Sequence, residues 1–361
     1  MQQTVSCKVS LAAHVRFSWS TSFQSAALLH PRRNSASLSS ECSFHSCSDS
    51  SSRYHCSPLL LNVSSVPFFT PDAKKCSSLY ADFVEFAVRE VAESTQVSPF
   101  PIQEGLKEVL AYDGKTKLHS NAFQSSKMRL FRIANLDGGE NMQVLNMAIF
   151  PNPEYDLPIF CADFFSTATK HIIVLDLNPL YDTGKNKWYK TKYYADLIPV
   201  MNRYIKLLPW GQRLTAESLQ FFSPIVIWTK LELRQEVQEN LFPAFKEYLQ
   251  VWLKMMENAE IASNSEEVQR NQRAQHRYLL WRATKDPGRP LLHRLFGEAW
   301  CEMYIKDFLF NGATTLGTET FLDYFPEYRC ADGSINKERS IVGKSYVKRP
   351  WDEHGNFTMA I

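Results

Sequence analysis

Two polar side chains interrupt apolar runs in the middle of the chain. Asp163 lies in Phe160-Cys-Ala-Asp-Phe-Phe165, and Asn146 lies in Val144-Leu-Asn-Met-Ala-Ile149. Burial raises the pKa of a carboxyl because it disfavours the charged form, so a buried Asp can donate a proton near neutral pH. Asp163 is therefore a candidate acid, with Asn146 on the preceding strand. The alternative is that Asp163 only accepts backbone hydrogen bonds in a turn.

A third candidate, Asp286, stands in the segment Thr284-Lys-Asp-Pro-Gly288. A turn that ends a helix is the ordinary place for such an Asp. Near the C-terminus, residues 336–351 combine five basic side chains with two aromatic ones. This segment is either a solvated tail or a lid whose cations pair with carboxylates of a ligand or of an acidic protein. The basic residues are Lys337, Arg339, Lys344, Lys348 and Arg349.

Several common catalytic motifs are missing from the sequence. It has no GxGxxG or GxxxxGK[ST] turn for nucleotides, no HExxH metal motif and no GxSxG nucleophile motif. The three cysteines after position 76 form no CxxC pair, so neither a disulfide framework nor a cysteine metal site is expected. The 24 Phe, 15 Tyr and 8 Trp can build a large core or line a pocket for a flat conjugated ligand. An enzyme made from this chain would thus rely on carboxylates, amides and an aromatic pocket.

The hydrophobic pattern predicts an α+β scaffold for these residues. Apolar residues recur at helical spacing over residues 79–91, and strand patterns follow at 130–133, 141–150, 157–165, 171–177 and 222–228. The three middle strands are joined by links of four to six residues, which suit antiparallel hairpins. Residues 233–260, 266–284 and 291–309 are amphipathic and helical in pattern. We therefore expect one domain over residues 75–361, with helices covering an antiparallel sheet and a basic loop near its end.

The first 70 residues differ in composition from the rest of the chain. They contain 19 Ser and five Lys or Arg but only two acidic residues, which is typical of a plastid transit peptide; a plain disordered tail is the alternative. The remaining residues carry 35 basic and 36 acidic side chains, so their near-neutral balance argues against nucleic acid as a partner. No run of 18 apolar residues occurs, so we expect no membrane span.

A series of motifs, in order along the chain, resembles the ferredoxin-dependent bilin reductases. The resemblance covers about residues 78–355 and includes residues 142–165, 174–180, 208–211, 221–224 and 274–288. The later motifs, residues 307–312, 324–328, 343–346 and 349–352, are most similar to the land-plant phytochromobilin synthases. The resemblance implies an α/β/α sandwich that binds biliverdin IXα between its antiparallel sheet and its C-terminal helices. It also implies single electrons from reduced [2Fe-2S] ferredoxin, with no flavin, nicotinamide or metal bound.

The polar residues of the implied pocket depart from the phytochromobilin synthase pattern. That pattern has Asp at position 146 and Asn at position 163, whereas this chain has Asn146 and Asp163, as phycoerythrobilin-type enzymes do. Asp286 matches the helix-end Asp that the family uses to reduce the A-ring. Because the place of the acid decides where a bilin radical is protonated, we expect Asp163 to serve the 15,16 bridge and Asp286 the A-ring. The expected product is then a four-electron one, phycourobilin or phycoerythrobilin; two-electron reduction to phytochromobilin is the alternative.

Two other functions are open at this point: a non-catalytic bilin carrier, and a plastid reductase for an open tetrapyrrole derived from chlorophyll. We expect the biliverdin propionates to meet Arg339, Lys344 and Arg349. Ferredoxin is acidic, so it should dock on exposed cations in a manner that weakens with salt. The docking candidates are Lys230, Arg234, Lys337, Arg339, Lys344, Lys348 and Arg349. We expect a monomer in the plastid stroma.

Overall fold

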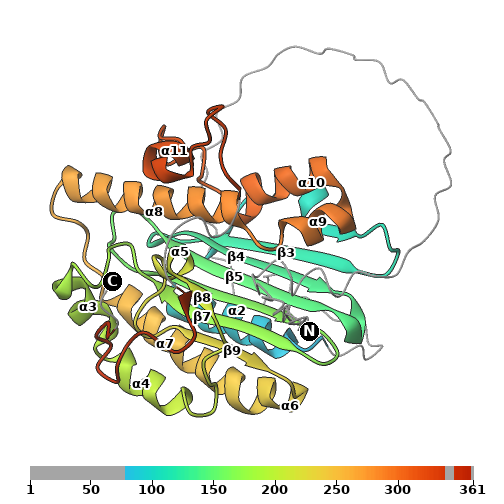
Figure 1. Ribbon diagram of the computed structural model, residues 1–361, viewed down its shortest axis with the longest axis horizontal. Coiled ribbons are helices and arrows are strands. Elements are labelled where there is room, and N and C mark those ends of the chain that lie inside the picture. Colours follow the sequence, from blue (N-terminus) through green and yellow to red (C-terminus); the bar gives the residue numbers. More distant parts are fainter. Residues whose placement is uncertain (1–77, 338–344, 359–361) are drawn as a thin grey trace, which may run out of the picture.

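The computed structural model describes residues 78–337 and 345–358 (Figure 1). The predicted transit peptide, residues 1–70, lies outside the described residues. Two candidate ligands of the propionates, Arg339 and Lys344, also lie outside them. Among the described residues, no helix combines the length and the apolar character that crossing a bilayer requires.

An eight-stranded antiparallel sheet forms the centre of the fold, in the order β1-β3-β4-β5-β6-β7-β9 with β2 paired to β3. Its strands are β1 (Ser98–Pro99), β2 (Glu108–Leu110), β3 (Lys117–Gln124), β4 (Met128–Asp137), β5 (Gln143–Pro151), β6 (Ile159–Ser166), β7 (His171–Asn178) and β9 (Ile227–Leu231). The strands from β3 to β7 are neighbours in the sheet in chain order, because short links allow each one to fold back on the one before. A small second sheet pairs β8 (Leu214–Thr215) with β10 (Ser345–Tyr346).

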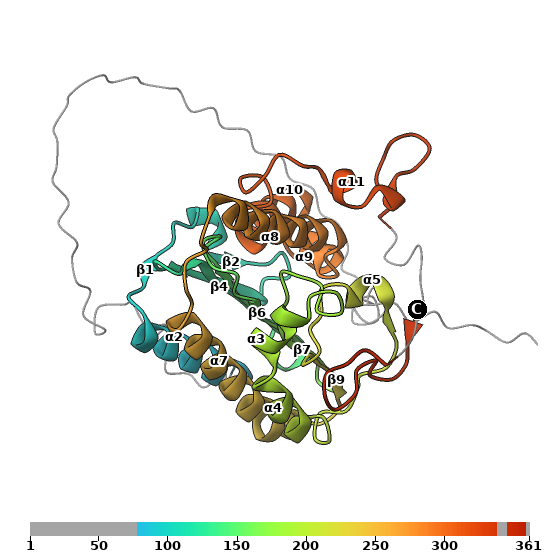
Figure 2. The same cartoon turned by 90° about the vertical axis from the view of Figure 1, so that its left-hand side faces the viewer.

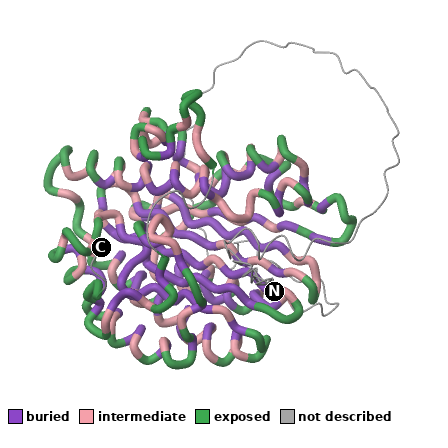
Figure 3. Tube along the Cα trace, in the orientation of Figure 1, coloured by how far each residue is buried: buried purple, intermediate pink, exposed green. Residues whose placement is uncertain are grey.

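Helices lie on both faces of the sheet (Figures 1 and 2). One face packs against α2 (Ala81–Ser94), α3 (Lys187–Tyr194), α4 (Leu197–Tyr204) and α7 (Phe242–Glu257). The other packs against α5 (Ala216–Leu219), α8 (Ser265–Lys285), α9 (Arg289–Phe296), α10 (Glu298–Met303) and α11 (Phe321–Tyr324). The strands are buried over most of their length, and the outward turns of the helices are exposed (Figure 3). Each face of the sheet therefore has its own apolar core.

The predicted α+β class with an antiparallel sheet is confirmed, and the middle strands fall within two residues of their expected ends. The strand β3 was not predicted, because Leu-His-Ser-Asn-Ala alternates weakly between apolar and polar residues. The helix expected over residues 291–309 is interrupted at Gly297, whose φ of 87° ends α9. The chain then resumes as α10 and passes into a π-helical segment, Tyr304–Leu309. The helix expected over residues 233–260 likewise begins with α6 (Arg234–Glu236) and a π-helical turn, Val237–Leu241, before α7.

Candidate active site

A cavity lies between the sheet and the helical layer formed by α8, α9 and α10. Its empty volume is about 560 Å³, including the part that opens to solvent. Four strands of the sheet, the α8–α9 turn, α9 and the π-helical segment contribute to its walls. The lining residues are Leu118, Ala134, Leu136, Val144, Asn146, Asp163, Asp286, Pro287, Gly288, Leu291, Leu292, Tyr304 and Leu309. The cavity is therefore apolar, with two carboxyl groups and one amide set into it.

The sheet register places Asn146 and Asp163 side by side on the floor of this cavity. They are directly opposite each other in the β5–β6 ladder, so their side chains project from the same face. The Asn146 Nδ2 donates a hydrogen bond of 3.1 Å to Asp163 Oδ1. Asp163 thus lies inside a strand and not in a turn, contrary to the alternative considered from the sequence.

The electrostatic surroundings of Asp163 act in two directions. Burial raises its pKa to about 6, and the carboxyl of Asp286 contributes to the rise. Two cations, the half-buried Arg282 and the buried Arg132, and the hydrogen bond from Asn146 oppose it. The carboxyl is therefore mostly ionised at neutral pH but can take up a proton within about one pH unit of neutrality.

Asp286 approaches the same cavity from the opposite side. It caps the C-terminal end of α8 with an extended ψ of 122°, and Pro287 follows, since proline cannot continue the helix. Gly288 lies against the Asp286 carboxyl, so that an added Cβ would come within 3.3 Å of Oδ2. Asp286 is thus a helix-ending turn residue, as its motif suggested, and also a wall of the cavity.

The π-helical segment supplies the aromatic side of the cavity. The Tyr304 hydroxyl forms a hydrogen bond of 2.9 Å with the Ser120 hydroxyl on β3. Its ring stacks between Trp300 and Phe308, with ring centres 4.6 and 5.0 Å away. Burial raises the pKa of Tyr304, so its hydroxyl stays protonated. π-Helical turns frequently occur at functional sites, and this one holds an aromatic ring rigidly at the pocket wall.

The residue that sequence analysis missed is Arg132 on β4. Its Nη1 donates to Asn146 Oδ1 (2.6 Å) and to the Asn146 carbonyl (3.1 Å), and its Nε donates to the Leu309 carbonyl (2.6 Å). The side chain is only 3% exposed. A lone Arg inside the apolar strand Leu130-Phe-Arg-Ile133 was the available signal, because a buried cation requires hydrogen-bond acceptors.

The structure places Arg349 apart from the cavity. Its guanidinium donates to the backbone carbonyls of Pro224 and Val226 and lies 5.6 Å from the ring centre of Trp351. Arg349 does not line the cavity, so its assignment to a propionate stays a prediction that would require these contacts to change. Of the other docking candidates, Arg234, Lys337 and Lys348 are exposed, and the Lys230 Nζ donates to Gln212 Oε1 at 3.0 Å.

A second buried carboxyl, Asp176 on β7, is not part of the cavity. Burial raises its pKa to about 6, but its oxygens accept hydrogen bonds from the backbone and side chain of Ser223 and from Asn178. These bonds connect β7 to the segment before β9. A raised pKa alone therefore does not identify the acid of this site; contact with the cavity does.

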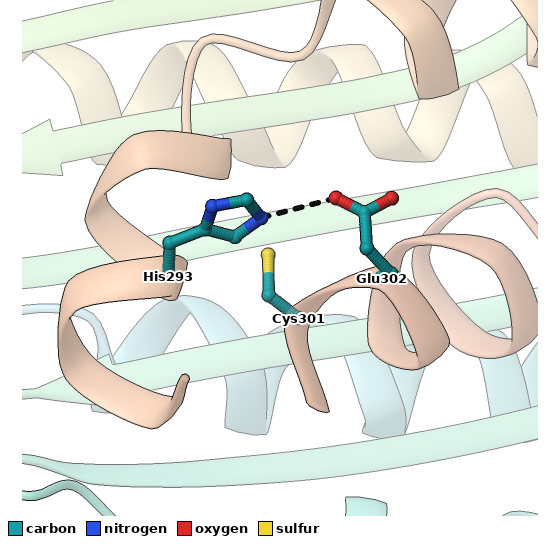
Figure 4. Close-up of side chains that lie close together, drawn as sticks. All are labelled: His293, Cys301 and Glu302. Carbon is teal, nitrogen blue, oxygen red and sulfur yellow. Dashed lines mark hydrogen bonds and ion pairs between the residues drawn. The ribbon is translucent and has the colours of Figure 1, made fainter. Parts of the chain in front are cut away.

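Three potential metal ligands meet between α9 and α10 (Figure 4). The ligand atoms of His293, Cys301 and Glu302 lie within 4.8 Å of one another. Glu302 already pairs with the Arg289 guanidinium and accepts from His293 Nε2 at 3.0 Å. Burial raises the pKa of the Cys301 thiol to about 12, and the thiol donates to the Arg289 carbonyl at 3.7 Å. These contacts account for the cluster as a link between the two helices, and we assign no ion to it.

Comparison with known proteins places this geometry in a family. The profile of the family described as "Ferredoxin-dependent bilin reductase" matches residues 84–311. The chain is 46% identical over 278 residues to phytochromobilin:ferredoxin oxidoreductase, chloroplastic, of Arabidopsis thaliana, covering 77% of this chain and 84% of the relative. It is 37% identical over 240 residues to phycoerythrobilin:ferredoxin oxidoreductase of Nostoc punctiforme, covering 65% and 93%.

A solved structure agrees with the sequence comparisons. The crystal structure of phytochromobilin synthase from tomato, in complex with biliverdin, superposes with a TM-score of 0.76 at 50% identity and covers 78% of this chain and 100% of that one. The residues that match the family profile, 84–311, contain the central sheet, the cavity lining and both carboxyl groups described above. The chain belongs to the ferredoxin-dependent bilin reductase family.

Proposed function

We propose that this enzyme reduces biliverdin IXα at its A-ring by two electrons and two protons, giving phytochromobilin. Bilin reduction with electrons from ferredoxin follows from family membership. The finer assignment is supported by the greater similarity to two phytochromobilin-forming proteins, at 46% and 50% identity, than to the phycoerythrobilin-forming relative at 37%. The four-electron product that the polar residues alone led us to expect is less well supported than two-electron reduction to phytochromobilin.

The observation that carries the proposal is the arrangement of the two acids around one apolar cavity. Asp286 lies at the end of α8 and lines the cavity, where its Oδ2 would be 3.3 Å from a Cβ added at Gly288. Asp163 accepts a hydrogen bond from Asn146 and is close to two guanidinium groups, which favour its ionised form. We assign proton donation to Asp286, which matches the helix-end Asp of the family motif, and we assign to Asp163 the role of electrostatic partner for a protonated pyrrole.

The reaction then balances with the residues at hand. Two reduced ferredoxins supply one electron each, and two protons are added to the A-ring system. Asp286 gives the first proton to the bilin radical, is reprotonated from solvent through the open side of the cavity, and then gives the second proton. Apolar side chains such as Leu291 and Leu292 keep bulk water away from the rings. In this scheme the electrons come from ferredoxin, and the protons come from Asp286 and solvent.

We place the protein in the plastid. The first 70 residues have the composition of a transit peptide, and the Arabidopsis relative is chloroplastic. Docking of acidic ferredoxin is proposed on the exposed cations Arg234, Lys337 and Lys348. Family membership also favours the enzyme over the non-catalytic carrier considered from the sequence.

Product analysis tests the proposal directly. The full-length protein is incubated with biliverdin IXα and reduced ferredoxin, and the bilins are separated and identified by their absorption spectra. A single product with an intact 15,16 double bond and a reduced A-ring supports the assignment. A product reduced at both the A-ring and the 15,16 bridge would instead establish the four-electron reaction, for which the pocket position of Asp163 is the specific argument.

A further inference from the structure

Arg132 is a buried cation whose acceptors are all neutral. Within residues 78–337 and 345–358, none of the ion pairs between side chains includes it. Its three hydrogen bonds go to the carbonyls of Leu309 and Asn146 and to the Asn146 side chain. The rings of Phe150 and Phe310 lie 5.8 Å from the guanidinium. A buried charge of this kind is costly, and its contacts lead directly to the cavity floor.

These contacts determine which way the Asn146 amide faces. A guanidinium can only donate hydrogen bonds, so the atom 2.6 Å from Arg132 Nη1 must be the amide oxygen. The amide nitrogen then has to face Asp163, where it donates to Oδ1. If the amide were turned, its oxygen would face the Asp163 carboxyl, and only a protonated carboxyl could make a hydrogen bond to it.

We propose that Arg132 is a positioning residue for bilin reduction: it holds the Asn146 amide as a donor, so that Asp163 stays the acceptor of that hydrogen bond and is kept from donating a proton to the bilin. The proposal rests on the proposed function for its catalytic meaning. Its structural part concerns the ligand-free enzyme. Arg132 also binds the carbonyl at the end of the π-helical segment that carries Tyr304, which ties the cavity floor to its aromatic wall.

The charges around Asp163 allow the positioning effect to be separated from a simple charge effect. Arg132 favours the ionised carboxyl both through its charge and through the amide it orients. Replacement by Lys keeps the charge but cannot reproduce three bonds from a rigid planar group. The other groups that interact electrostatically with Asp163 are Asp286 and Arg282 from the helical layer, Cys161 on its own strand and Tyr80 from the opposite face. None of these changes in the variant.

The experiment follows the protonation of Asp163 in the full-length, ligand-free protein. Infrared spectra are recorded during a pH titration, and the carboxyl band that Asp163→Asn removes is assigned to Asp163. Loss of a hydrogen bond to a charged group should raise the midpoint of this band in Arg132→Lys by about one pH unit. The matched control is Arg129→Lys, because Arg129 lies on the same strand and binds Gln275 and Asn311 but not Asn146. Its midpoint should stay at the wild-type value.

A second background shows whether Arg132 acts through the amide. In Asn146→Ala the amide is absent, so adding Arg132→Lys should leave the Asp163 midpoint unchanged. An equal shift in both backgrounds would overturn the proposal, as would a wild-type midpoint in a folded Arg132→Lys protein. In turnover with biliverdin, Arg132→Lys should lower the share of A-ring product relative to Arg129→Lys. The titration needs no turnover, so a failure of the proposed function and a failure of this inference are distinguishable.

Discussion

The two faces of the central sheet are built from the same strands but behave differently. On β6, Phe160 and Phe164 are fully buried and pack against Phe245 of α7, with ring centres 5.8 and 6.3 Å away. Asp163, one of the two residues between these positions that face the other way, lines a cavity. Alternation along a strand therefore places a closed aromatic core on one side and a solvent-accessible site on the other. The tightly packed core on the closed face keeps the strands rigid. The rigid strands hold the polar side chains of the open face in place among apolar neighbours.

The largest expected effect is on the open face, in Asp286→Asn. Loss of a positioned acid should lower the rate of bilin reduction by about 10²–10⁴-fold, while biliverdin binding is retained because the shape of the cavity is unchanged. Stopped-flow absorption with reduced ferredoxin measures the rate, and a binding titration measures the affinity. Asp307→Asn is the control, since Asp307 lies in the π-helical segment but does not line the cavity. A rate within a few-fold of the wild-type rate would remove Asp286 from the proposed role.

On the closed face the expected effect is on stability and not on chemistry. Phe245 is fully buried among Phe83, Phe160 and Phe164, so Phe245→Ala should lower the free energy of unfolding by about 3–5 kcal/mol. Urea unfolding measures this loss. The rate per folded molecule and the product should match the wild type, because no group of the cavity is altered. A changed product would show that packing on the closed face affects the chemistry of the open face, so the two faces would not act independently.

The strands of the sheet could be predicted from the sequence, but the arrangement of the polar residues on its open face could be predicted only in part. Strand periodicity was enough to predict the antiparallel sheet and to mark Asp163 and Asn146, because each interrupts an apolar run. It could not show that they lie opposite each other, since register depends on hairpin geometry. Asp286 was recognised through its family motif; its local sequence reads as an ordinary turn.

The role of Arg132 depended on contacts between distant segments. Its partners stand 14 and 177 residues away in sequence, and no local pattern connects them. The break at Gly297 and the π-helical turn after it were also missed, because helical periodicity in residues 291–309 is continuous through both. Local patterns thus predicted the layers, and the packing of the helices onto the sheet determined the site.

A smaller effect is expected for the stability of Asp163→Asn, with a definite dependence on pH. Folding raises the pKa of Asp163 from 3.8 to about 6, so between these values the folded protein binds the proton more tightly than the unfolded chain. Its ionisation therefore costs stability as pH rises from about 4 to 6, and this cost is constant above pH 6. Asn carries no charge, so the variant should be more stable than the wild type by about 1–3 kcal/mol at pH 7.

The pH dependence distinguishes this effect from better packing. The difference between Asp163→Asn and the wild type should be much smaller at pH 4, where Asp163 is protonated in the folded protein and about half protonated in the unfolded chain. Asp176 also has a raised pKa, but it titrates equally in both proteins and cancels from the comparison. Urea unfolding at pH 4 and pH 7 provides the measurement. A gain of the same size at both pH values would mean that the carboxyl charge is not its source.

The smallest expected effect concerns Gly288, which lies close to the Asp286 carboxyl. An Ala at position 288 would put its Cβ 3.3 Å from Asp286 Oδ2, a contact so tight that the carboxyl has to move by a few tenths of an ångström. Gly288 has a negative φ of −78°, so the substitution adds crowding without backbone strain. Because proton transfer requires hydrogen-bond reach, we expect the rate of A-ring reduction in Gly288→Ala to fall by about three- to tenfold, with unfolding unchanged. Gly105→Ala is the control, since a Cβ there meets nothing within 4 Å. An unchanged rate in a folded Gly288→Ala protein would show that the Asp286 carboxyl tolerates displacement. The chemistry of the open face would then be less sensitive to the position of its acid than the stability of the closed face is to its packing.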